Sequence, residues 1–201
     1  MLFYFCGNFI LVFFIIKMNM MKKILIALSV VFMLSFSVLP LQAQDGSSYK
    51  SGIGLRAGGG YYDIIAASFK TFVTEPGAIE LNLGFRPYAS VYSGYNQFNL
   101  SFSASYQHHF PIGSVEGLKW FVGGGLTAYN TFSGNKDYSG FGLGLFPTGG
   151  VDYKFGNIPL NVSADFRPTF AIVKPDYYGY SYLSYSRFYA GNIGASVRYT
   201  F

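Results

Sequence analysis

Apolar and polar residues alternate along most of the chain after residue 44. Within 79–86, Ile, Leu, Leu and Phe alternate with Glu, Asn, Gly and Arg, and the same period of two recurs within 98–110, 160–167 and 192–201. Successive side chains of a β-strand point to opposite faces, so this period predicts strands with one apolar and one polar face. No part of this region keeps a helical period for long.

The pattern predicts eight strands, separated by clusters of Gly, Pro, Asn and Ser. Their expected ranges are 51–62, 64–73, 78–88, 96–110, 119–129, 139–155, 160–172 and 188–201. Most of them are long enough to cross a bilayer when tilted, which takes about 9–11 residues. We therefore predict an all-β fold, an eight-stranded antiparallel transmembrane up-and-down β-barrel over residues 51–201.

The charged residues of these strands fall on the polar face. They are Arg56, Lys70, Glu80, Arg86, Asp152, Lys154, Asp165, Arg167 and Arg198. The competing fold is a soluble lipocalin-like barrel or β-sandwich, in which the apolar face points inward. The export signal, the aromatic content and the final strand favour a membrane barrel instead. Its lumen can hold these charges as hydrogen-bonded pairs, whereas a dry apolar core cannot hold unpaired ones.

Two strands carry related segments, IELNLGFRP at 79–87 and LNVSADFRP at 160–168. In an eight-stranded barrel these strands lie on opposite walls. We therefore expect Arg86 and Arg167 to face each other at similar height, with Asp165 nearby.

The lumen of an eight-stranded barrel is just wide enough for side chains to fill it. We expect Lys70 and Glu80, which flank a turn, to pair there. The charges form either an ion-pair network that holds the barrel shut or an anion-attracting, arginine-lined constriction. Pro87 and Pro168 each remove a hydrogen bond between strands, which predicts looser pairing toward one rim.

Composition limits the remaining function classes. Charged residues make up 11% of the chain and aromatic residues 20%, which fits neither a disordered tail nor a soluble enzyme surface. The formal net charge is +5, but three of the lysines lie in the N-terminal region, which leaves 11 Lys and Arg against 9 Asp and Glu. We expect no nucleic-acid partner. The one cysteine, Cys6, precedes the predicted barrel, so the barrel has no disulfide or thiolate metal site.

Residues 21–43 have the features of a signal peptide. Two lysines follow Met21, an apolar stretch runs to Leu41, and Ala43 provides a small residue at the cleavage edge. The alternative is a retained transmembrane helix, because the apolar stretch reaches the lower length limit for spanning. We expect residues 44–50 to be a short linker.

A second apolar stretch lies directly upstream of this complete signal. Possible translation starts are Met1, Met18, Met20 and Met21. The simplest hypothesis is that residues 1–20 are an over-extended N-terminus and that translation begins at Met21 or Met18.

The last strand places apolar residues at every second position up to a terminal Phe, among them Ile193, Val197, Tyr199 and Phe201. In this respect the chain resembles the small outer-membrane β-barrel proteins of the OmpA/OmpX-like and "porin family" types over residues 50–201. The resemblance implies an integral outer-membrane location, contact with outer-membrane lipids and lipopolysaccharide, and a final strand read by the outer-membrane barrel assembly machinery.

Connection lengths predict the orientation. The short connections are 74–77, 111–118 and 156–159, and they share one end with both termini, which we expect to be periplasmic. The longer connections are 90–96, 130–138 and 174–187. The last of these carries Tyr177, Tyr178, Tyr180, Tyr182 and Tyr185 among Ser and Gly. Such a loop is a candidate recognition surface, and the alternative is an aromatic hairpin standing in the lipopolysaccharide layer.

We expect no catalytic residue, metal or cofactor. His108 and His109 point to opposite faces of a strand near its periplasmic end, so they are poorly placed to bind one metal jointly. The loop carboxylates Asp63, Asp137 and Asp176 lack the spacing of a calcium loop. The glycine runs 58–60 and 123–125 lack the Lys-Ser/Thr and the helix of a phosphate loop and fit a tightly curved barrel.

The sequence thus predicts a non-enzymatic outer-membrane β-barrel with a structural or interaction role through its Tyr-rich extracellular loops. Two alternatives stay open. The first is a small passive channel or porin, and the second is a lipid-modifying enzyme of the outer membrane, which would need a histidine near the outer rim.

Overall fold

The computed structural model describes residues 49–89, 96–113, 115–134, 139–174 and 187–201. The chain divides into two units, Met1–Gln42 and Ala43–Phe201, and all described residues belong to the second. The predicted signal peptide, the region upstream of it and most of the linker lie outside the described residues. The strands are β1 (Ser51–Gly58), β2 (Ile65–Phe72), β3 (Gly77–Ala89), β4 (Asn96–Pro111), β5 (Leu118–Ser133), β6 (Gly140–Lys154), β7 (Leu160–Phe166), β8 (Thr169–Val173), β9 (Phe188–Tyr189) and β10 (Ile193–Thr200).

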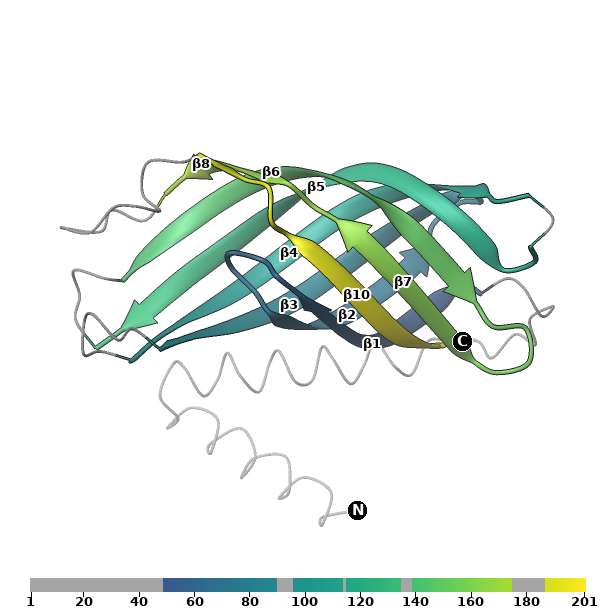
Figure 1. Ribbon diagram of the computed structural model, residues 1–201, viewed down its shortest axis with the longest axis horizontal. Coiled ribbons are helices and arrows are strands. Elements are labelled where there is room, and N and C mark those ends of the chain that lie inside the picture. Colours follow the sequence, from purple (N-terminus) through teal and green to yellow (C-terminus); the bar gives the residue numbers. More distant parts are fainter. Residues whose placement is uncertain (1–48, 90–95, 114, 135–138, 175–186) are drawn as a thin grey trace, which may run out of the picture. The chain divides into compact units, whose positions relative to one another are not determined.

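The strands close into a single antiparallel barrel (Figure 1). Each strand from β1 to β6 pairs with the next one along the chain, and β10 pairs with both β7 and β1. Strand β6 also pairs with β8, which pairs with β9. Strands β7 and β8 together form one interrupted wall of the barrel, and β9 and β10 together form another. The ten strands therefore make eight walls. The prediction of a closed eight-stranded antiparallel barrel is confirmed.

Two neighbouring walls are interrupted near the same height. Strand β7 ends before Arg167 and Pro168, and the second break lies between β9 and β10. Proline has no N–H to give to a neighbouring strand, which accounts for the first break. The two walls stay joined there because Arg167 N–H donates to the carbonyl of Asn192 at 2.8 Å.

Most strand ends agree with the prediction to within a few residues, but the first strand does not. It was expected to continue to residue 62 and instead ends at Gly58. The connection then bends inward, so that Tyr62 and Asp63 are each 2% exposed. Strand β5 is longer than expected and reaches Ser133, which shortens the loop predicted at 130–138.

The two faces of the barrel are reversed relative to a soluble protein. Exposed side chains include Leu55 at 58%, Leu83 at 62% and Leu126 at 60%, whereas Lys70 and Arg198 are fully buried inside. A charged interior and an apolar exterior suit a barrel whose solvent is lipid. The described residues contain no helix long and apolar enough to cross a membrane, a finding that does not bear on crossing by strands.

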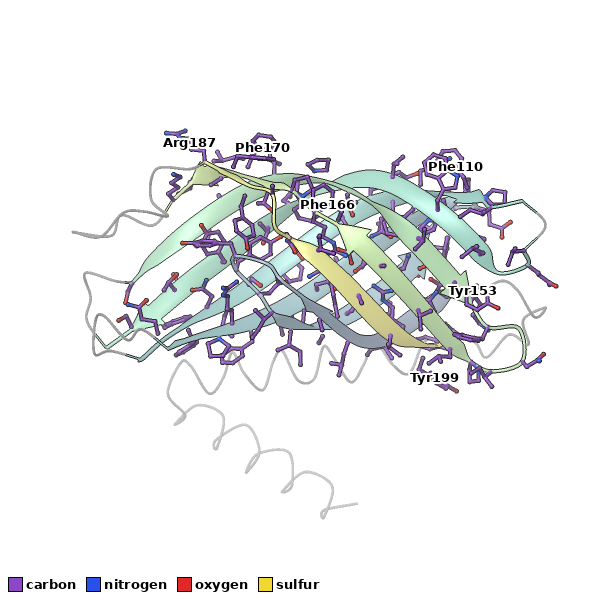
Figure 2. The ribbon with its side chains drawn as sticks, viewed as in Figure 1. Phe110, Tyr153, Phe166, Phe170, Arg187 and Tyr199 are labelled. Carbon is purple, nitrogen blue, oxygen red and sulfur yellow. The ribbon has the colours of Figure 1, made fainter. Side chains whose placement is uncertain are left out.

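The barrel has two distinguishable ends. The chain enters β1 and leaves β10 at one of them, the terminal end, where Ser51 and Phe201 exchange backbone hydrogen bonds of 2.9 Å. The short β2–β3, β4–β5 and β6–β7 connections lie at this end, and we call the opposite one the loop end. Aromatic side chains point away from the barrel near both ends, as Phe110, Phe170 and Tyr199 show in Figure 2.

Candidate functional site

The barrel interior holds a continuous network of ion pairs, with Glu80 on β3 at its centre. The Oε1 atom of Glu80 accepts from Arg167 at 2.7 Å and lies 2.8 Å from Nη2 of Arg198. Asn82 donates to the same oxygen at 3.1 Å, and Gln107 donates to Oε2 at 2.6 Å. Since Glu80 and both arginines are almost fully buried, one carboxylate neutralises two cations from the opposite side of the barrel.

Toward the loop end the network continues through Asp165. Its carboxylate lies 2.7 Å from Nη2 of Arg56 and 2.7 Å from Nε of Arg167. Arg56 also approaches Asp63, with 3.7 Å between Nη1 and Oδ1. Asp63 lies in the connection between β1 and β2, where burial raises the pKa of its carboxyl above the usual value near 3.8, against the opposing effect of Arg56. Of the two aspartates, Asp63 makes the longer contact with Arg56.

Toward the terminal end a second group of charges closes the lumen. Lys70 on β2 reaches Asp152 on β6 with 2.8 Å between Nζ and Oδ1. Tyr49, which precedes β1, donates to Oδ2 of Asp152 at 3.2 Å and is 8% exposed. Asn161 donates to the same oxygen at 3.0 Å and accepts from Arg198 at 3.3 Å. This last contact links the group to the Glu80 network.

Aromatic rings fill the lumen along the wall formed by β5 and β6, and each lies over a glycine of the neighbouring strand. A Cβ atom on Gly125 would meet Cζ of Phe146 at 2.7 Å, and one on Gly150 would meet Cζ of Phe121 at 2.8 Å. A Cβ atom on Gly142 would collide with the ring of Tyr129. These glycines are needed for space, because any side chain there would displace a ring.

Cations from the other walls approach two of these rings. Nζ of Lys70 lies 4.9 Å from the centre of the Phe121 ring, and the Arg167 guanidinium lies 5.8 Å from that of Phe146. A cation over an aromatic face is attracted by the ring quadrupole, more strongly where water is excluded. The lumen is thus packed by alternating rings and ion pairs.

Opposite charges balance in this network. The ion pairs among the described residues join four cations, Arg56, Lys70, Arg167 and Arg198, to four carboxylates, Asp63, Glu80, Asp152 and Asp165. Lys154 is also buried, but it lies at the terminal end and donates to the carbonyl of Ile158 at 3.0 Å. The eight ion-paired side chains therefore carry no net charge among themselves.

The structure places every charged residue of the predicted lumen set inside the barrel or at its ends, but it changes one of the predicted partnerships. Lys70 and Glu80 are cross-strand neighbours in register, yet Lys70 pairs with Asp152 and Glu80 with the arginines. Arg167 contacts Asp165 as expected. Arg86 donates to the backbone carbonyl of Gly60, which the inward bend of the first connection brings beside β3, and its position relative to Arg167 stays a prediction.

Sequence reasoning missed the two residues that close the ends of the network, Tyr49 and Asp63. Neither lies in a strand, so strand periodicity gave no signal for them. Tyr62 was expected at the end of the first strand but lies beyond the end of β1, and it stacks on Tyr129 with 5.9 Å between ring centres. Burial raises the pKa of the Tyr62 hydroxyl, so Tyr62 stays neutral.

The remaining predicted residues divide into two groups. The loop tyrosines Tyr177, Tyr178, Tyr180, Tyr182 and Tyr185, with Asp137 and Asp176, lie outside the described residues. In β10, Ile193, Val197 and Tyr199 face outward with 63%, 53% and 58% exposure, and Phe201 follows the strand.

The two histidines lie near the terminal end of β4. His109 is 1% exposed and packs against the rings of Phe72 and Phe121, whereas His108 is half-buried and packs against Phe110. Among the described residues, no three His, Cys, Asp or Glu side chains come close enough to hold a metal ion.

Comparisons with known proteins find a resemblance to solved structures. No family model and no curated protein matches the chain. The crystal structure of Neisserial surface protein A is similar to it with 16% sequence identity and a TM-score of 0.43. The match covers 75% of this chain and 94% of the other. The assignment of an eight-stranded barrel stands on the strand pairings themselves.

Proposed function

We propose that the protein is an integral barrel of the bacterial outer membrane, non-enzymatic, with a lumen closed by its own side chains. The observation that carries the proposal is the combination of an apolar exterior with a charge-balanced, ring-packed interior. The apolar exterior needs lipid around it. The terminal end, with its short connections, faces the periplasm, and the loop end faces outward.

A closed barrel explains the interior better than a passive channel does. An anion-selective constriction needs cations without nearby carboxylates, as in pores lined by Arg or Lys. Here Arg56, Arg167 and Arg198 each lie within hydrogen-bond distance of a carboxylate oxygen. An ion entering the lumen would have to replace these contacts and displace the aromatic rings beside them.

Conductance in planar lipid bilayers tests the closed lumen. The refolded full chain is expected to insert without a steady ionic current. Glu80→Ala removes the carboxylate between Arg167 and Arg198, so we expect it to admit anions and to raise the current. Glu75→Ala, an exposed change in the β2–β3 turn, is the matched control and should stay silent. A steady current through the unaltered protein would overturn the closed barrel in favour of the channel.

The interaction role rests on the composition of the loop between β8 and β9. Its five tyrosines combine large contact areas with hydroxyl groups, and Ser and Gly give it adaptable hydrogen bonding. We propose lipopolysaccharide as its first partner to test. Binding of the refolded barrel to immobilised lipopolysaccharide should fall when the five tyrosines are replaced by Ser. Binding that is unchanged by this replacement would remove the loop from the proposal.

A further inference from the structure

The barrel closes where its first strand meets its last, and Figure 1 shows β10 lying between β1 and β7. Strands β1 and β10 pair residues 52–58 with 194–200, a shorter ladder than the one between β4 and β5, which pairs 97–111 with 119–133. We call the β1–β10 pairing the seam. The seam closes a longer stretch of chain than any hairpin does, at a higher cost in entropy, so we expect it to form last.

The inner face of the seam alternates large and small side chains. Arg56 on β1 lies opposite Ser196 on β10, and Arg198 on β10 lies opposite Gly54 on β1. Gly194 is the next inward residue of β10 beyond Ser196, toward the loop end. Each arginine therefore lies beside small residues of the other strand, which leave its side chain room to cross the seam.

Arg56 crosses the seam in one direction. From β1 it reaches over β10 to Asp165 on β7, donating from Nε to Oδ2 at 3.0 Å and from Nη2 to Oδ1 at 2.7 Å. Gly194 is the residue of β10 that pairs with Asp165. A Cβ atom on Gly194 would meet Cζ of Arg56 at 2.5 Å and Nε at 2.7 Å. The guanidinium therefore lies directly on the β10 backbone.

Arg198 crosses the seam in the opposite direction. From β10 it reaches past β1 to Ser68 on β2, donating from Nε to Oγ at 2.9 Å, and its Nη2 lies 2.8 Å from Oε1 of Glu80 on β3. Gly54 on β1 pairs with both Arg198 and Ser68, so it separates them in the sheet. Nη1 donates to Ser163 on β7 at 2.8 Å. One guanidinium thus holds walls on both sides of the seam.

These contacts depend on a closed seam. In the chain, Arg56 and Asp165 are 109 residues apart, and Arg198 and Ser68 are 130 residues apart. With the seam open, the walls would form a sheet with β1 at one edge and β10 at the other. Opening would carry each arginine away from its partners, and separating a buried ion pair is costly where water cannot replace the lost contact. The two arginines therefore stabilise the closed seam directly.

We propose that Arg56 and Arg198 form a latch: once the seam has paired, each arginine crosses it and fixes one seam strand to a wall beyond the other. The latch acts on this seam rather than on the barrel as a whole, so its loss lets β1 and β10 part while the other strand pairs stay intact. It depends on the strand order and on these side-chain contacts. It therefore goes beyond the function proposed above, which concerns the closed lumen.

Hydrogen–deuterium exchange, resolved along the chain by mass spectrometry, tests the latch in the refolded full chain. The amides of β1 and β10 that face the seam exchange when it opens, at a rate set by the free energy of opening. The latch variants are Arg56→Gln and Arg198→Gln. We expect each of them to speed exchange in both strands by at least about 100-fold, because one partner of a buried ion pair is lost.

A disulfide across the seam shows whether the faster exchange comes from opening there. Leu55 and Val197 are outward-facing register partners, so Leu55→Cys with Val197→Cys joins β1 to β10 when oxidised. Ala104→Cys with Leu126→Cys is the matched control, which joins β4 to β5 in the same way. Both pairs carry Cys6→Ser, which removes the single cysteine of the chain. Oxidation of the seam pair should cancel the acceleration caused by the latch variants, and oxidation of the control pair should not.

Gly194→Ala is a milder second variant, because it keeps every charge and puts a methyl group where the Arg56 guanidinium lies. It should speed exchange at the seam in the same disulfide-dependent way. Gly124→Ala, whose added Cβ atom has an ordinary spacing of 3.5 Å from its nearest neighbour, is its control and should not. The latch is refuted by unchanged exchange at the seam in all of these variants, by acceleration that persists with the seam pair oxidised, or by equal suppression with either disulfide.

Discussion

At the scale of single residues, Glu80 carries the most connections in the lumen. Two arginines share its Oε1 atom, and Gln107 donates to Oε2. Removing one partner of a buried ion pair leaves the other charge uncompensated in a place where water cannot replace it. The position of Glu80 on β3 matters because both Arg167 and Arg198 must cross the lumen to reach it.

Glu80→Gln is therefore expected to lower the free energy of unfolding by about 3–5 kcal/mol. Urea unfolding of the protein in lipid vesicles, followed by tryptophan fluorescence, measures the change. Glu75→Gln alters an exposed carboxylate and should leave stability unchanged. A loss of the same size in both variants would contradict the role assigned to Glu80.

The two loop-end aspartates, Asp63 and Asp165, should differ in how replacement by asparagine changes stability. Burial raises the pKa of Asp63, so folding favours its protonated form, and the resulting stabilisation is lost as pH rises through the raised pKa. Relative to Asp63→Asn, the unaltered protein should thus become less stable as pH increases from about 3.8 toward neutrality. Asp165→Asn, which leaves Arg56 and Arg167 without their shared carboxylate, should destabilise the protein at neutral pH. Unfolding in urea at several pH values checks both results.

At the scale of elements, β5 and β6 show how glycine and aromatic residues fit together across a strand pair. Phe146 lies over Gly125 because the two are register partners on these strands. The adjacent Gly124 faces outward, and a Cβ atom there would have Phe146 O as its nearest neighbour, at an ordinary 3.5 Å. Gly125 therefore leaves space for the Phe146 ring, whereas the position of Gly124 has room for a side chain.

Gly125→Ala should destabilise the barrel by about 1–3 kcal/mol, the usual cost of overpacking. The added methyl group would meet Phe146 at 2.7 Å and collide with the Ala104 carbonyl. Gly124→Ala is the matched control, and we expect little change. Midpoints of urea unfolding for the two variants provide the comparison, and equal midpoints would refute the packing argument.

At the scale of the whole molecule, the stability cost of a charged substitution on the barrel exterior should show how deep that position lies in the membrane. Leu126 and Asn130 lie on the outward face of β5, and Leu126 is the farther of the two from the loop end. A charge costs most at the centre of the bilayer and little near the interface. The same substitution at both positions therefore measures where the apolar band ends.

Leu126→Arg is expected to cost about 2–4 kcal/mol of stability in lipid vesicles, and Asn130→Arg about 0–1 kcal/mol. Reversible unfolding in urea gives both values. Equal costs at the two positions would mean that the bilayer does not end between Leu126 and the loop end.

The alternating pattern predicted most of the fold but only part of the site. Strand faces follow directly from a period of two, so the inward position of Arg56, Glu80 and Arg198 could be expected from their parity. Their partners could not, because long side chains cross the lumen and choose among several carboxylates. Lys70 was thus predicted beside Glu80, its register partner, and instead reaches Asp152.

The sequence by itself determined which residues face outward, how many walls the barrel has and where its short turns lie. Each of these depends on local periodicity and turn chemistry. Only the tertiary structure decided that Tyr49 and Asp63 close the network and that the β1–β2 hairpin ends before its neighbours β3 and β4 do. These features depend on where the first connection bends and how far each neighbouring strand extends, and both emerge only when the walls are assembled around the lumen.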